Sequence, residues 1–206
     1  MPDGACNKVR RGRKFDQVLA GARDVFLSDG FEGASVDEIA RRAGVSKATL
    51  YSYFPDKRLL FMEVAKAECV RQADQAVEKI DMSAPVRHVL IEAAQQMQRF
   101  ITSDFGLRIF RICVAESERF PTLGAEFYES GPALVRNRLI GFFKTAAERG
   151  ELKIDDFDLA ADQFQALCKS DLRERLIMQV VTSVSEADRK RITDAAVDLF
   201  LARYGA

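Results

Sequence analysis

The chain has 206 residues, of which 48% are hydrophobic and 30% are charged, and this composition is that of a globular protein rather than a disordered one. Its 31 lysines and arginines balance its 31 aspartates and glutamates, so the net charge by itself does not indicate a nucleic-acid partner. No apolar run approaches the roughly 18 residues that span a bilayer, and the N-terminus lacks a signal-peptide core, so we expect a cytoplasmic protein with no membrane partner.

The charges are distributed unevenly along the chain. Residues 1–60 carry 11 Lys/Arg against 8 Asp/Glu, a net of +3, whereas residues 61–206 carry 20 against 23, a net of −3. Five of the basic residues lie in the stretch KVRRGRK, at residues 8–14. Such a basic stretch is typical of proteins that contact DNA, although a solvated leader has the same composition. We therefore expect residues 1–12 to form a flexible basic arm.

Helical periodicity dominates the rest of the sequence, and no alternating strand pattern is visible, so the fold class is predicted to be all-α. Apolar residues over 15–26 mark one face of a first helix, and Gly30 can take the left-handed conformation that ends it. Ser35 and Glu38 have the spacing of a capping box at the start of a second helix, which Gly44 closes.

A short third helix is predicted from Lys47 to Tyr53, with Ser46 as its N-cap and the following Phe-Pro pair as its end. Two short helices joined by a glycine turn form a helix-turn-helix, whose second helix enters the major groove of DNA. Lys47, Thr49, Tyr51 and Tyr53 could contact phosphates or base edges there. The alternative for each is a surface position braced against neighbouring helices.

The remainder of the chain is predicted to form a second helical unit. A long helix should run from Lys57 into the 70s, and further helices are expected over residues 86–103, 107–118, 159–172 and 186–204. Gly131-Pro132 should mark a helix start or a kink, and Gly150 a helix end.

The residues that carry catalysis or bind metals are scarce. The four cysteines have no paired spacing, and the single histidine has no partners of the kind that nucleophilic or metal sites require. No nucleophile elbow or phosphate-binding glycine loop is present. We therefore expect no enzyme, no catalytic residue, no metal and no cofactor.

The stretch SVDEIARRAGVSKATLYSYFPDKRLLF, at residues 35–61, resembles the DNA-binding signature of the TetR family of bacterial transcriptional regulators, and the likeness extends over roughly residues 13–64. The resemblance implies a helix-turn-helix domain at residues 13–60, with its motif at 35–54, and a regulatory and dimerisation domain at 61–206. Many members carry histidine at the position of Tyr53. The DNA contacts that it implies fall on Ser35, Lys47, Ala48, Thr49, Tyr51, Ser52, Tyr53 and Lys57.

The resemblance also implies a small-molecule inducer, apolar or aromatic, and a homodimer formed by the last two long helices. A phenylalanine-rich centre is read either as the inducer pocket or simply as core, with candidates Phe100, Phe105, Phe110, Cys113, Phe127, Phe142 and Phe164. The candidates for the dimer interface are Phe164, Ala195, Ala196, Leu199 and Phe200.

The function expected from the resemblance is a ligand-responsive regulator, a repressor released from a pseudo-palindromic operator by its inducer. The alternative is a helical adaptor or sensor of the same fold that does not act on DNA. A further stretch, FRICVAESERFPTLGAEFYESGP, resembles a subgroup of regulators whose genes are often tied to export.

Overall fold

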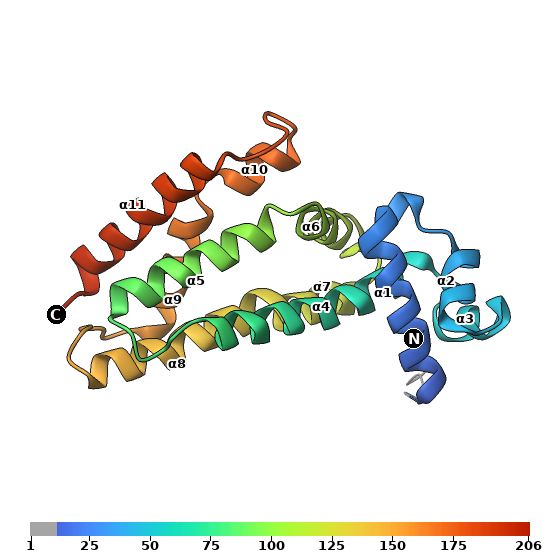
Figure 1. The fold of residues 1–206 in the computed structure, drawn as a ribbon, viewed down its shortest axis with the longest axis horizontal. Coiled ribbons are helices and arrows are strands. Elements are labelled where there is room, and N and C mark those ends of the chain that lie inside the picture. The colour runs from blue at the N-terminus through green and yellow to red at the C-terminus, as the bar shows by residue number, and fades with distance from the viewer. Residues whose placement is uncertain (1–11) are drawn as a thin grey trace, which may run out of the picture. The chain divides into compact units, whose positions relative to one another are not determined.

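The computed structural model describes residues 12–206, and within that range it is helical apart from turns, loops and one isolated bridge between Leu152 and Gly205. The predicted all-α fold class is confirmed. The elements are drawn in Figure 1 and run, in chain order, α1 (Arg13–Gly33), α2 (Val36–Ala43), α3 (Lys47–Tyr53), α4 (Lys57–Lys79), α5 (Val86–Ile101), α6 (Asp104–Glu116), α7 (Pro121–Tyr128), the π-helix η1 (Glu129–Ala133), α8 (Leu134–Glu148), α9 (Phe157–Lys169), α10 (Leu172–Ile177) and α11 (Glu186–Tyr204).

The chain divides into two compact units, and the division falls between Ala65 and Lys66, inside α4. The sequence pattern places the boundary after residue 60. The difference arises because the first turns of α4 belong to the core of the first unit, where Phe61 and Val64 are buried. The predicted arm at residues 1–12 lies, apart from Gly12, outside the described residues.

Local capping chemistry sets the helix starts of the first unit. The Ser35 hydroxyl accepts the Glu38 backbone N–H at 3.1 Å, and the Ser46 hydroxyl accepts the Thr49 N–H, also at 3.1 Å, as predicted. Only half of the expected capping box forms, because the Glu38 carboxylate pairs with Arg41 and Arg42 instead of returning to Ser35.

Two glycines shape the turns of this unit. Gly44 ends α2 and forms the turn to α3, as predicted, and it does so in the left-handed conformation, with φ 64° and ψ 33°. Gly30 also has a positive φ, 70°, but its ψ is 179°, so it kinks α1 rather than capping it in the left-handed region as predicted.

An aromatic cluster holds the first unit together. The ring of Phe26 lies 5.0 Å from that of Phe61 and 6.1 Å from that of Phe31, while Phe15 lies 5.3 Å from Phe54. These contacts join α1 to the segments that flank α2 and α3, because aromatic rings bury large apolar areas. The aromatic cluster therefore fixes the position of α3 within the first unit.

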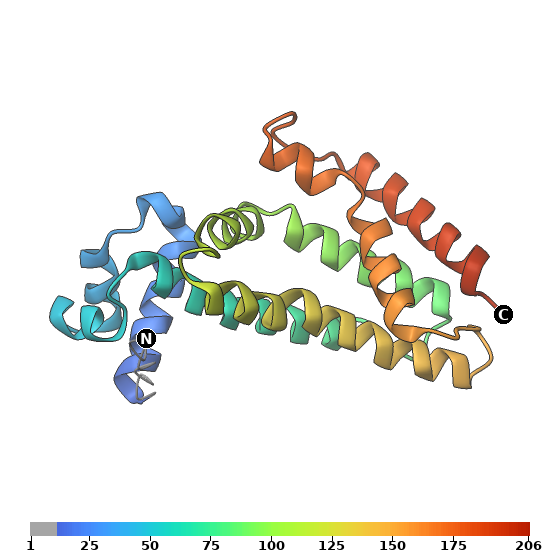
Figure 2. The same ribbon diagram turned by 180° about the vertical axis from the view of Figure 1, so that it is seen from behind.

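In the second unit a core of phenylalanines lies between α8, α9 and α11. Phe164 is 5.1 Å from Phe200 and 6.1 Å from Phe143, measured between ring centroids, and all three side chains are fully buried. Figure 2 shows α11 running beside α5 and α9, with which it packs.

A buried polar bridge ties the same helices. The side-chain amide of Gln98 on α5 donates to the Cys168 carbonyl on α9 at 3.0 Å, and its oxygen accepts the Thr193 hydroxyl of α11 at 3.1 Å. Gln98 and Thr193 are fully buried, so both polar groups are satisfied inside the core.

One predicted kink takes the form of a π-helix, and one predicted helix is interrupted. The kink predicted at Gly131-Pro132 is the π-helix η1, which joins α7 to α8. The helix predicted over residues 159–172 divides into α9 and α10, because Ser170 adopts φ 44° and ψ −132°. A serine with positive φ is strained, and it ends α9 at Lys169.

Candidate functional site

An exposed, largely polar face of the first unit lies on α3. Leu50 points into the core and is 1% exposed, whereas Tyr51 is 49% exposed and Lys47, Ala48 and Ser52 are also exposed. Since residues three and four apart share a helix face, these four side chains form one surface, here called the α3 face. Four of the predicted contact residues therefore lie together.

The other predicted contact residues of α3 interact with neighbouring side chains of the first unit. Tyr53 is half-buried, and its ring meets that of Phe15 edge-on at 5.8 Å. Thr49 is half-buried as well, and its hydroxyl shares a 2.9 Å hydrogen bond with the Ser46 hydroxyl. These two side chains brace α3, which is the alternative that the sequence left open for them.

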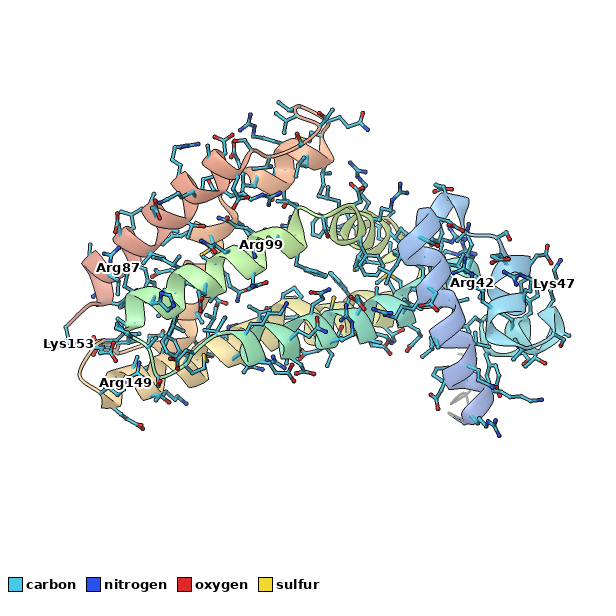
Figure 3. The ribbon with its side chains drawn as sticks, viewed as in Figure 1. Arg42, Lys47, Arg87, Arg99, Arg149 and Lys153 are labelled. Atoms are coloured by element: carbon cyan, nitrogen blue, oxygen red, sulfur yellow. The ribbon has the colours of Figure 1, made fainter. Side chains whose placement is uncertain are left out.

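Acidic side chains partly neutralise the cations beside the α3 face. Lys47 forms an ion pair with Asp37 of α2, and both side chains are exposed. Arg41 and Arg42 of α2 both bond to Glu38 and hold the pKa of that carboxyl at about 2. Figure 3 labels Arg42 on α2 and Lys47 on α3. A ligand phosphate would therefore compete with Asp37 for Lys47.

Lys57 has a structural role that the sequence did not predict. Its ammonium donates to the Phe31 carbonyl at 2.8 Å and to the Ala34 carbonyl at 3.1 Å, and it lies 4.5 Å from the centre of the Phe31 ring. The cation thus satisfies carbonyl groups at the C-terminal end of α1. Two of its three N–H donors are thereby used inside the first unit, and the predicted phosphate contact stays a prediction.

The second unit contains a cavity of about 390 Å³, a size typical of small-molecule sites. Most of its lining is apolar and comes from α4 to α9. Five predicted pocket residues line it: Phe100, Phe110, Cys113, Phe127 and Phe142. The prediction was wrong for Phe105, which is not among the lining residues, and for Phe164, which is buried in the phenylalanine core.

The sequence did not identify the polar part of this cavity. Arg138 of α8, Lys169 of α9 and Arg173 of α10 line it, together with Gln72, Gln96 and Gln165. Their only signal in the sequence is a basic residue within an otherwise amphipathic helix, and surface lysines and arginines give the same signal.

Burial disfavours the reactive thiolate form of the cysteines at residues 69, 113 and 168. Burial raises the pKa of Cys69 to about 12, with a further contribution from Glu68, and raises the pKa of Cys168 to about 12. Burial also raises the pKa of Cys113. Because the thiolate is the reactive form, these three thiols are poorly suited to sensing oxidants.

The candidates for a dimer interface divide into two sets. Phe164, Ala196 and Phe200 are at most 2% exposed, so they cannot contact a second chain, and their assignment to the interface was wrong. Ala195 is exposed and Leu199 is 59% exposed on the opposite face of α11. The three buried candidates therefore pack inside the chain itself, and Ala195 and Leu199 are the two predicted interface residues left exposed.

Residues 12–206 contain neither a metal-binding cluster nor a membrane-spanning helix. No group of three or more histidine, cysteine, aspartate or glutamate side chains in this range is placed to hold a metal ion. None of the helices in the same range combines the length and apolarity needed to cross a membrane.

Two family models match the chain. The model described as bacterial regulatory proteins, tetR family, matches residues 18–64, and the model described as AefR-like transcriptional repressor, C-terminal domain, matches residues 88–206. The solved structure of a TetR-family transcriptional regulator of Mesorhizobium loti MAFF303099 is 28% identical, with a TM-score of 0.80 over 94% of this chain and 98% of that chain.

Further relatives agree with these matches. The structure of the flavonoid-responsive regulator FrrA is 33% identical, with a TM-score of 0.67 over 95% of this chain and 98% of that chain. The HTH-type transcriptional regulator YdeS of Bacillus subtilis (strain 168) is 26% identical over 159 residues, which are 74% of this chain and 77% of that protein.

Proposed function

This chain belongs to the TetR family of bacterial regulatory proteins and is a DNA-binding transcriptional regulator. From that premise we propose that it is a homodimeric repressor. Its affinity for a pseudo-palindromic operator falls when a small molecule fills the cavity of its second unit. The ligand acts by binding more tightly to the conformation whose two recognition helices do not fit successive major grooves. The observation that carries the proposal is the α3 face, presented next to a left-handed glycine turn.

The α3 face enters the major groove, where each of its side chains makes a different contact. Lys47 leaves Asp37 for a phosphate, Tyr51 reaches phosphate or base edges, and Ala48 and Ser52 lie against the groove floor. Ser35, which caps α2, contacts the DNA backbone beside the α3 face. Thr49 and Tyr53 set the position of α3, and Lys57 fixes the end of α1. The basic arm at residues 1–12 adds phosphate contacts.

The homodimer forms through the faces of α9 and α11 that one protomer leaves uncovered. Leu199 and Ala195 on α11 are exposed, and so are Leu159 and Ala166 on α9, which packs against α11. Small and apolar residues on adjacent helices allow a second copy to pack closely, as the cores of homodimer interfaces require. These residues replace the buried candidates of the sequence stripe.

A DNA-binding assay with matched variants tests the proposal. The probe is a labelled duplex from upstream of the chain's own gene, and fluorescence anisotropy measures its affinity over a series of salt concentrations. Lys47→Ala should weaken binding and lower the salt slope by about 1.8, because each of the two protomers loses one phosphate contact of about 0.9. Tyr51→Ala should weaken binding with a smaller change in slope.

The control is Lys190→Ala on α11, which removes an exposed lysine of the second unit and should leave binding unchanged. If the unmodified protein does not bind the duplex at low salt, the alternative function is favoured, a helical adaptor or sensor that does not act on DNA. If it binds but both α3 variants bind equally well, the assignment of the α3 face is wrong and the DNA-binding function stands.

A further inference from the structure

The charged residues of the cavity are all of one sign. Arg138, Lys169 and Arg173 line it, and none of the described lining residues is acidic. Apolar side chains such as Phe100, Phe110 and Phe127 form most of the remaining wall. A cavity of this kind places positive charge at the boundary of an apolar space, where electrostatic interactions are stronger than in water.

Several donors of these cations are unused within the chain. The side-chain ammonium of Lys169 makes no hydrogen bond or ion pair with any residue in the range 12–206. The Nε of Arg173 and the Nη1 of Arg138 are buried and have no hydrogen-bond partner among the described residues. Arg138 is partly compensated, because its Nη2 bonds to Asp74. The pair Lys169 and Arg173 is therefore the less compensated part of the wall.

The surroundings of Lys169 disfavour its own charge. Burial lowers the pKa of this lysine, and the nearby positive charge of Arg173 lowers it further, while Glu174 and Asp162 oppose the shift. The carboxylates compensate the site only in part: Glu174, which is exposed, forms a 3.4 Å ion pair with Arg173, and Asp162 bonds to Arg136. Two half-buried cations with so little compensation destabilise the ligand-free protein.

Arg173 is held in position for a ligand. Its guanidinium carbon lies 3.9 Å from the centre of the Phe110 ring, a stacked arrangement that orients the planar donors. Phe110 and Arg173 both line the cavity, so the donors and the apolar wall meet at this point. A planar carboxylate matches the fork of a guanidinium and also accepts from an ammonium.

We propose that the ligand is an amphiphilic monoanion, a carboxylic acid with an alkyl or aromatic body, whose carboxylate is bound by Lys169 and Arg173 and whose body lies among the phenylalanines. The proposal rests on the ligand-binding role given to the cavity above and names the chemical class of the ligand. Bound carboxylate supplies the missing anion, so binding free energy comes from a charge pair that forms only in the complex.

Direct binding of matched probes tests the charge requirement. Isothermal titration or ligand-detected NMR would compare decanoate, decanamide and decylamine, and in parallel 2-naphthylacetate with its primary amide. These sets keep the apolar body and change only the head group. We expect decanoate or 2-naphthylacetate to bind at least about tenfold more tightly than its amide, and decylamine to bind more weakly than either.

Variants of the two cations test the residues. Lys169→Met and Arg173→Gln should each lower the affinity for the acid about tenfold and leave that for the amide unchanged, whereas the exposed Lys190→Met should change neither. Lys169→Met should also raise the melting temperature of the ligand-free protein, because it removes an uncompensated buried charge. A purely structural lysine would give a lower melting temperature and no head-group preference.

The outcomes separate this proposal from the proposed function. If the amides bind as tightly as the acids, or if Lys169→Met keeps full affinity for the acid, the anionic class is wrong and a ligand-binding cavity remains. If no acid, amide or amine binds, both the anionic class and the ligand-binding role of the cavity are overturned. Operator binding, measured separately, is unaffected by either result.

Discussion

Replacing Gly21 by alanine tests how the first unit positions α3. Gly21 is buried in α1, where this helix packs on α2. A Cβ at this position would lie 2.6 Å from the Ala43 backbone nitrogen and 2.9 Å from its Cα and Cβ. Real Cβ atoms do not approach a backbone that closely, and a backbone cannot rotate away as a side chain can. The two helices must therefore separate.

The size of the effect follows from two opposing contributions. Alanine stabilises a helix interior by about 1 kcal/mol relative to glycine, and overpacking of a core destabilises by about 1–3 kcal/mol. Since the obstacle is backbone, the upper end applies, and Gly21→Ala should lower the free energy of unfolding of the first unit by about 2 kcal/mol. Operator affinity should fall as well, because Ala43 directly precedes the turn that aims α3.

Urea unfolding followed by circular dichroism at 222 nm measures the stability change, with Gly141→Ala as the matched control. Gly141 lies in α8, and a Cβ added there would meet nothing within 4 Å, so alanine at this position should stabilise by about 0.5–1 kcal/mol. The packing argument fails if Gly21→Ala raises the urea midpoint as Gly141→Ala does, or leaves both stability and operator affinity unchanged.

Three further predictions address single side chains. Asp37→Asn should tighten operator binding by up to about fivefold, because it frees Lys47; equal or weaker binding by anisotropy would contradict this. Lys57→Met should lower the free energy of unfolding in urea by about 1–2 kcal/mol, since two carbonyls lose their donor. It should leave the salt slope of DNA binding unchanged; a lower slope would show that Lys57 contacts a phosphate. Leu199→Lys should shift the dimer to monomer in analytical ultracentrifugation, while Leu27→Lys on α1 should not; a Leu199→Lys dimer of unchanged affinity would exclude the α11 face.

The sequence predicted best what depends on neighbouring residues. Ser35 and Ser46 cap α2 and α3 because a hydroxyl three residues before a free N–H needs no distant partner. Gly44 likewise adopts its turn conformation from local sterics. The family resemblance follows from the same short, contiguous stretch, so the helix-turn-helix and the fold class were accessible without a structure.

The sequence failed where a side chain has two possible partners. The stripe that includes Ala196 and Phe200 is apolar whether it faces its own protomer or a second one, and only the packing of α11 on α5 and α9 decides. Lys57 bonds to Phe31, 26 residues away, and no local pattern reports this. Lys169 reads as a surface lysine until the cavity beside it is known.

The Gln98 bridge has a consequence for conformational uniqueness rather than for stability. An apolar side chain at this position would tolerate sliding of α11, because apolar contacts have no direction. Gln98 instead requires the Cys168 carbonyl and the Thr193 hydroxyl at the same time, so a shift of α11 by one residue leaves a buried amide unpaired. Three helices are thereby restricted to one axial alignment, and the exposed side of α11 always displays the same residues.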